Sequence, residues 1–319
     1  MVLVFRKVVP VCVSALYPLV KKIRREESPT ELLATSCQDV QRAKCLTMPL
    51  FVMSGVSSFL PYSGVQPLHL YEPQYMRMHH DLVKDTAANQ SSRSKPKIVA
   101  AYKNENDEIS TTGVVLELLD WKTVSSLPTP RISAKYEAGP RVKISRIFYS
   151  DGGGGDASYL VAEVEIIDDS PSLVNYTEVQ TAWRNIWDII RRLVELQEKA
   201  KERPCLTSAA LALGQKRGVL SASDVWRPVA FIQELHFRQA SAVHSKYGLK
   251  MANEHESGAP LNELHRAYKA ELGNLKSTLQ IFPALLRLPS MADVLAEASQ
   301  IVYAEIWRVE SLLAASENE

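Results

Sequence analysis

The sequence predicts an α+β protein in which a β-rich N-terminal domain is followed by an α-helical domain. Polar and apolar residues alternate along 141–147 and again along 159–166, and strict alternation is typical of strands with one face in water. After Pro171 the apolar residues recur with a period of 3.6 instead of two, which is typical of amphipathic helices. The order of these two periods places the strands before the helices.

Two short strands and a helix open the β-rich part. Residues 49–53 and 66–70 are apolar and bounded by Gly, Pro or Ser, which favours strands with turns between them. Pro73 suits the first position of a helix, where its missing N–H costs nothing, and Glu72 suits the positive end of the helix dipole. The residues expected to face inward along this helix are Tyr75, Met76, Met78 and Leu82.

Further strands are expected along residues 97–102 and 109–119. The second contains Gly113, which predicts a bulge or a close approach of two backbones. Residues 85–96 are polar without apolar spacing, so we expect a surface loop there. The proline-containing segment 123–140 is expected to be irregular or to lie at a sheet edge.

A glycine-rich segment, 150–157, connects the two alternating stretches. Its four successive glycines invite comparison with a phosphate-binding loop. That loop requires Gly-Lys-Ser/Thr leading into a helix, whereas this segment has no lysine and precedes a predicted strand. We therefore expect the tip of a β hairpin.

Apolar stripes at helical spacing predict at least three long helices in the second half. The first begins near Val179, the second spans 261–279, and the third opens at Ser290 with Asp293 in the pattern of a capping box. Residues 228–247 are also expected to be helical, with a less regular stripe. Such stripes must be buried against one another or against the β domain.

Composition excludes several classes of protein. The net charge of +1 gives no overall field for nucleic acid or acidic substrates. None of the four cysteines forms a CxxC pair, so neither a zinc ribbon nor a thioredoxin motif is expected. No apolar run reaches the length of a membrane span. We expect no cofactor and no metal site.

The N-terminal segment has the composition of a targeting peptide. Residues 1–25 contain six basic residues around an apolar stretch and no acidic residue. This favours a plastid or a mitochondrion, while an N-terminal extension of a cytoplasmic protein is the alternative. We expect residues 1–46 to form an extension and linker, 47–169 the β domain and 170–319 the α-helical domain.

Two clusters of reactive side chains do not support a catalytic or metal site. His79 and His80 are adjacent, and neighbours on a helix point about 100° apart, so they rarely bind one ion. We expect them at the surface of the helix. Ser133 and Lys135 lie in a strand-like segment with no supporting peptidase motif, so their spacing does not indicate a catalytic dyad.

Several motifs are similar to those of a known family. Pro-Leu-Phe, then Leu-Pro-Tyr-Ser-Gly, then Pro-Leu-His-Leu-Tyr-Glu-Pro-Gln-Tyr stand in the order and spacing found in the N-terminal substrate-binding domain of Lon-type proteases. Over roughly residues 47–169 the chain resembles this domain. The matching segments are 49–51, 60–64, 67–75, 141–144 and 159–165.

The resemblance implies a fold and a kind of function. The fold it implies is a PUA-like β pseudo-barrel followed by helices. Val52 replaces a proline of the family pattern, and Gln74 replaces an arginine together with any ion pair that the arginine makes. The sequence shows neither GxxxxGK[ST] nor the Ser–Lys peptidase motif of full Lon proteases. We therefore expect a non-enzymatic, substrate-recognition or adaptor protein, acting in organellar protein quality control.

The expected partners are unfolded or apolar polypeptide segments or a partner protein. RNA binding by the PUA-like barrel is the alternative, and Arg141, Lys143 and Arg146 would form a small basic edge for it. For each candidate binding residue, plain core packing is the competing interpretation. The candidate substrate-binding residues are Phe59, Tyr62, Leu70, Tyr71 and Tyr75.

Overall fold

The structure is a computed structural model, and from residue 44 onward the chain forms one compact unit. The described residues are 45–53, 59–88, 95–104, 106–124, 131–150, 158–202, 204, 206–215, 218–257 and 262–316. The predicted targeting peptide and the four glycines of the predicted hairpin tip lie outside them.

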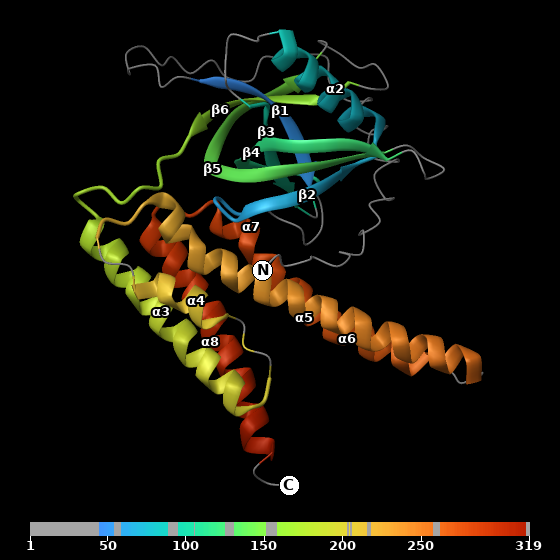
Figure 1. Cartoon of the computed structure of the whole chain (residues 1–319), viewed down its shortest axis with the longest axis vertical. Coiled ribbons are helices and arrows are strands. Elements are labelled where there is room, and N and C mark those ends of the chain that lie inside the picture. The colour runs from blue at the N-terminus through green and yellow to red at the C-terminus, as the bar shows by residue number, and fades with distance from the viewer. Residues whose placement is uncertain are drawn as a thin grey trace. The chain divides into compact units, whose positions relative to one another are not determined.

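Six strands form a sheet that closes on itself (Figure 1). The strand order is β2-β5-β4-β3-β1-β6, and β5 also pairs with β6. Only β1 and β3 run parallel, and the other described pairs are antiparallel. The α+β class, with a β pseudo-barrel before the helices, is thereby confirmed. The strands are β1 (Leu46–Met53), β2 (Gly64–Leu70), β3 (Lys97–Lys103), β4 (Ile109–Val124), β5 (Arg131–Tyr149) and β6 (Leu160–Ile166).

Strand β5 corrects the expectation of an irregular or edge segment at residues 123–140, of which 125–130 lie outside the described residues. It is 19 residues long and pairs with β2 through Ala138, then with β6 from Val142 onward. Pro140 lies where the strand changes partner, and the register of β4 shifts opposite it. A proline has no N–H to contribute to a ladder, so it is tolerated at this interruption.

The barrel core collects side chains from all five strands of the closed ring, including Leu50, Val99 and Val164. Gly113 lies where the backbones of β3 and β4 approach closely. A Cβ atom on Gly113 would stand 2.7 Å from the carbonyl oxygen of Ala100. The predicted close approach at this glycine is therefore confirmed.

Most helices lie where the sequence predicted them. Helix α2 begins at Pro73 as predicted, but it runs to Ala88 into the expected loop. The capping box is confirmed, because Ser290 Oγ accepts from the N–H of Asp293 and donates to its carboxylate. The helices are α2 (Pro73–Ala88), α3 (Tyr176–Lys199), α4 (Ser208–Ala212), α5 (Ala222–Ser257), α6 (Asn262–Leu279), α7 (Ile281–Leu285) and α8 (Met291–Ser316), with a 3₁₀ turn at Leu213–Gln215.

Helix α5 is longer than the 228–247 expected, and Pro228 lies inside it. Proline cannot donate to the carbonyl four residues earlier, here that of Asp224. The indole N–H of Trp183 on α3 donates to that carbonyl at 2.9 Å. A tertiary hydrogen bond thus replaces the missing helical one.

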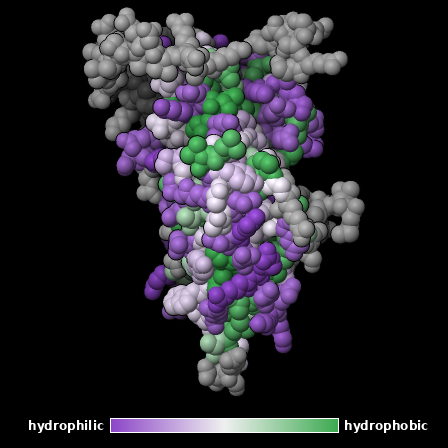
Figure 2. Space-filling model, turned by 90° about the vertical axis from the view of Figure 1, so that its left-hand side faces the viewer, coloured by the Kyte–Doolittle hydropathy of each residue, from purple (hydrophilic) through white to green (hydrophobic). Residues whose placement is uncertain are grey.

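The long helices pack in two pairs, α3 with α8 and α5 with α6 (Figure 1). Figure 2, which faces the α3 side, shows many hydrophilic side chains over the helices with hydrophobic ones between them, as amphipathic helices require. No helix in the described part is long and apolar enough to span a bilayer.

A buried ion pair joins the barrel to the helices. Arg141 on β5 donates to Asp169 at 2.8 Å and to the carbonyls of Leu286 and Leu288 at 3.1 and 2.8 Å. The indole N–H of Trp226 on α5 donates to the other oxygen of Asp169 at 2.8 Å. Arg141 therefore does not belong to the basic edge that the sequence suggested.

Candidate functional site

Three of the five candidate binding residues serve the fold. Phe59 and Leu70 are buried in the core that the strands share with the helices. The ring of Tyr75 stands 4.5 Å from that of Phe51, and its hydroxyl donates to the carbonyl of Val52 at 3.2 Å. In these three cases core packing, the competing interpretation, describes the side chain.

Tyr62 holds an unusual backbone conformation in a tight turn. Its φ is 55°, and the N–H of Ser63 donates to the carbonyl of Leu60 at 3.3 Å. Pro61 precedes it, which gives the pattern of a type II turn, where the third residue is usually glycine. The half-buried ring packs against the core, and burial, with Asp169 and Asp168 nearby, raises the pKa of the Tyr62 hydroxyl.

The exposed candidate, Tyr71, continues a row of outward-facing residues on β2. Alternate residues of a strand point to the same face, and Val65, Pro67, His69 and Tyr71 are all exposed. Val65 is 53% exposed and Tyr71 39%. We call these four residues the β2 face. The sequence indicated Tyr71 but missed the other three, although the alternation that unites them was visible in it.

Strand β2 is also an edge strand. Among the described strands its hydrogen-bonded neighbour is β5 alone. Proline occurs in sheets chiefly on edge strands, with its nitrogen toward the open side, so Pro67 fits this position. Val65 and His69, two residues away on either side, then direct backbone groups to the same open edge. The β2 face and this edge together can take another extended chain.

His79 does not lie at the surface as expected. Its side chain is fully buried, and neither ring nitrogen has a hydrogen-bond partner among the described residues. The ring packs edge-on against Trp121 at 5.0 Å. Burial, with His80 as a smaller cause, lowers the pKa of His79 to about 4. The described residues contain no group of three metal-binding side chains.

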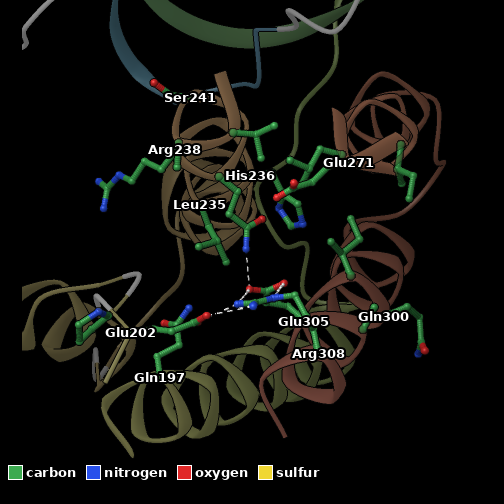
Figure 3. A pocket seen from close by; sticks show the side chains of 18 of the residues that line it. Gln197, Glu202, Leu235, His236, Arg238, Ser241, Glu271, Gln300, Glu305 and Arg308 are labelled. Atoms are coloured by element: carbon green, nitrogen blue, oxygen red, sulfur yellow. Dashed lines mark hydrogen bonds and ion pairs between the residues drawn. The ribbon is translucent and has the colours of Figure 1, made fainter. Parts of the chain in front are cut away.

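A second concave region lies among the helices (Figure 3). It is a groove of about 1100 Å³ lined by residues of α3, α5, α6, α7 and α8 and of the segment after α3. Arg308 donates to both Glu202 and Glu305 in it, at 2.7 and 2.8 Å. The less regular stripe of α5 was the only sign of this groove in the sequence, because polar residues such as His236 and Gln239 interrupt it.

No protein-family model matches the sequence, and no curated protein matches it. Solved structures that are similar to the chain include Lon N-terminal domains, the family that the motifs at 49–75 indicate. The N-terminal domain of the Mycobacterium avium complex Lon protease is 16% identical, with a TM-score of 0.33, over 60% of this chain and 98% of that one. The Lon N-terminal domain protein from Xanthomonas campestris is 17% identical, with a TM-score of 0.30, over 54% and 90%. Because these scores are low, it is the geometry of the β2 face that bears on function.

Proposed function

We propose that the chain is a non-enzymatic binding protein that holds an extended, apolar segment of another polypeptide on strand β2. The observation that carries the proposal is the combination of an open strand edge with an exposed apolar face on the same strand. Main-chain hydrogen bonds to such an edge supply affinity, and contacts with alternate side chains supply selectivity. Binding of this kind requires no bond chemistry.

The side chains of the β2 face indicate the polarity and charge of the ligand that it can bind. Val65, Pro67 and Tyr71 offer apolar surface, and aromatic residues are enriched at the centres of protein interfaces. Burial and Arg131 lower the pKa of His69, so this side chain is neutral at pH 7. An uncharged, apolar β-forming segment, as exposed by an unfolded protein, is the proposed ligand.

The alternative of RNA binding has less support. The expected basic edge loses Arg141 to the core, and Arg146 stands 3.8 Å from Glu163. Action within an organelle is a proposal that rests on residues 1–25 alone.

The test is a titration of a labelled apolar peptide against the full chain and two pairs of variants. Tyr71→Ser is matched by Tyr303→Ser, and Val65→Lys is matched by Val219→Lys, because all four side chains are exposed. The proposal predicts that the two β2 variants weaken binding about tenfold each, a size usual for truncating interface anchors. Equal losses in the matched controls, or no binding by the unaltered chain, would contradict it.

A further inference from the structure

The groove among the helices holds more negative charge than its own cations neutralise. In its floor the Arg308 guanidinium lies between two carboxylates, Glu202 and Glu305, so the three groups together carry one negative charge in excess. Glu305 is 6% exposed. Both carboxylates accept from the same guanidinium, so the group as a whole is short of one positive charge, and a cation entering the groove would be favoured.

Two side chains that line the groove, His236 and Gln239, carry hydrogen-bond acceptors. His236 is 4% exposed, and its Nδ1 lies 2.8 Å from the carbonyl of Ile232. A carbonyl only accepts, so Nδ1 carries the proton and Nε2 of the neutral ring is an acceptor. Nδ1 is used by this hydrogen bond, and Nε2 is the acceptor that the ring retains. Gln239 donates to Glu305 through its amide nitrogen, while its buried Oε1 has no partner in the described part of the chain.

The walls add further carboxylates. Among the lining residues four glutamates, at 202, 271, 297 and 305, face two arginines, at 238 and 308. The wall groups are partly paired, because Glu271 contacts Lys246 at 3.0 Å and Arg238 contacts Glu234 at 2.9 Å. Between them lie apolar side chains, namely Leu235, Val243, Leu275, Ile281 and Ile301.

We propose that this groove is a second binding site, which takes a basic peptide segment with apolar residues beside its lysines or arginines. An ammonium or guanidinium group would donate to His236 Nε2 and compensate the excess charge of the Glu202–Arg308–Glu305 group. The flanking apolar side chains would contact the apolar lining. The apolar side chains along this groove of about 1100 Å³ favour a peptide over a single small cation.

The ligand of this site differs from the apolar segment proposed for β2. The probe is a short fluorescent peptide of alternating lysine and leucine, titrated against the full chain, with glutamate in place of lysine as the control peptide. The basic peptide is expected to bind and to weaken as salt is added, and the acidic peptide is not. Equal binding of the two peptides would overturn the proposal.

Variants locate the site without disturbing the buried groups. The double variant Glu271→Gln with Glu297→Gln removes two wall carboxylates and is expected to weaken binding about three- to tenfold. The matched control is Glu178→Gln with Glu263→Gln, since both of these glutamates are exposed and outside the groove. An unchanged affinity in the groove variant, or the same loss in the control, would overturn the assignment.

Two further measurements sharpen the test. One shows whether the peptide binds in this groove or on the β2 face, and the other shows whether the occupant is a peptide or a simple polyamine. Tyr71→Ser on the β2 face is expected to leave affinity for the basic peptide unchanged, and a loss there would overturn a separate site. Spermine offers ammonium groups without a peptide backbone or apolar side chains. Displacement of the labelled peptide by an equal concentration of spermine would overturn the peptide as occupant.

Discussion

The guanidinium of Arg141 donates to the carboxylate of Asp169 across 2.8 Å, and the two side chains are 4% and 2% exposed. Burial raises the pKa of the Asp169 carboxyl, and Arg141 and the indole of Trp226 offset part of that shift. Arg141 also donates to carbonyls that follow α7. These hydrogen bonds join β5 to the segments that precede α3 and α8, so the stability of the barrel and that of the helices depend on each other.

Removing the charge of Asp169 should therefore be costly. Asp169→Asn keeps an acceptor for the Trp226 N–H but leaves Arg141 buried without a counter-charge. We expect the free energy of unfolding, measured in urea, to fall by about 3 kcal/mol.

The same substitution at an exposed pair is the control. Asp120 stands 3.8 Å from Lys135, and their side chains are 70% and 63% exposed. Asp120→Asn should change stability by less than about 0.5 kcal/mol. Equal effects at positions 169 and 120 would show that the buried pair does not couple barrel and helices.

A Cβ at Gly113 should strain the barrel. It would meet the Ala100 carbonyl at 2.7 Å and the Val99 side chain at 2.8 Å, so Gly113→Ala is expected to lower stability by about 2 kcal/mol. At Gly248 in α5 a Cβ would meet nothing within 4 Å, and Gly248→Ala should raise stability by about 0.5–1 kcal/mol. Thermal unfolding of both variants checks the two signs, and a stabilising Gly113→Ala would refute the close approach.

The left-handed backbone at Tyr62 predicts an inverted order of two variants. Alanine retains the steric cost of φ 55°, and glycine does not. Although glycine is smaller and more flexible, Tyr62→Gly should be more stable than Tyr62→Ala by about 1 kcal/mol. Urea midpoints of the two variants decide the matter, and the reverse order would mean that the turn relaxes when the ring is lost.

His79 predicts a loss of stability in mild acid. Its folded pKa is about 4, against about 6.5 in an unfolded chain, so the unfolded state binds the proton first as pH falls. Stability should thus drop by about 2 kcal/mol between pH 7 and pH 5 through this residue.

The variant His79→Leu isolates that contribution. Burial also lowers the pKa of His236, so the variant should retain part of the acid sensitivity and lose the share due to His79. Unfolding free energies at pH 7 and pH 5 give the comparison. Identical pH dependence in the variant and the unaltered chain would mean that His79 is protonated without cost.

The sequence predicted those helix starts that depend only on residues at the start itself. Pro73 begins α2, and Ser290 with Asp293 caps α8, because each motif satisfies or removes backbone groups near it. Where the effect of a proline depends on residues distant in the sequence, the sequence alone did not predict the structure around it. Pro140 sits at a change of strand partner, and Trp183 replaces the hydrogen bond that Pro228 cannot make.

The candidate sites show the same division. Alternation along β2 was present in the sequence, but which apolar residues face outward depends on how β5 and the helices cover the other face, as Leu70 and Tyr71 show. The groove forms only where α3, the segment after it and α5 to α8 meet, and apart from the less regular stripe of α5 no spacing within one segment indicates it. The buried His79 contacts Trp121 of β4, which is distant from it in the sequence.

Hydrogen–deuterium exchange on the full chain reports directly whether a peptide binds along β2. With an apolar, β-forming peptide added, we expect slower exchange of the amides of β2, Gly64–Leu70, with no change in α3 or α8. The Tyr71→Ser variant should lose this protection and Tyr303→Ser should keep it. Unchanged exchange in β2 while the peptide is bound would show that the ligand lies elsewhere and would refute the proposed function of this strand.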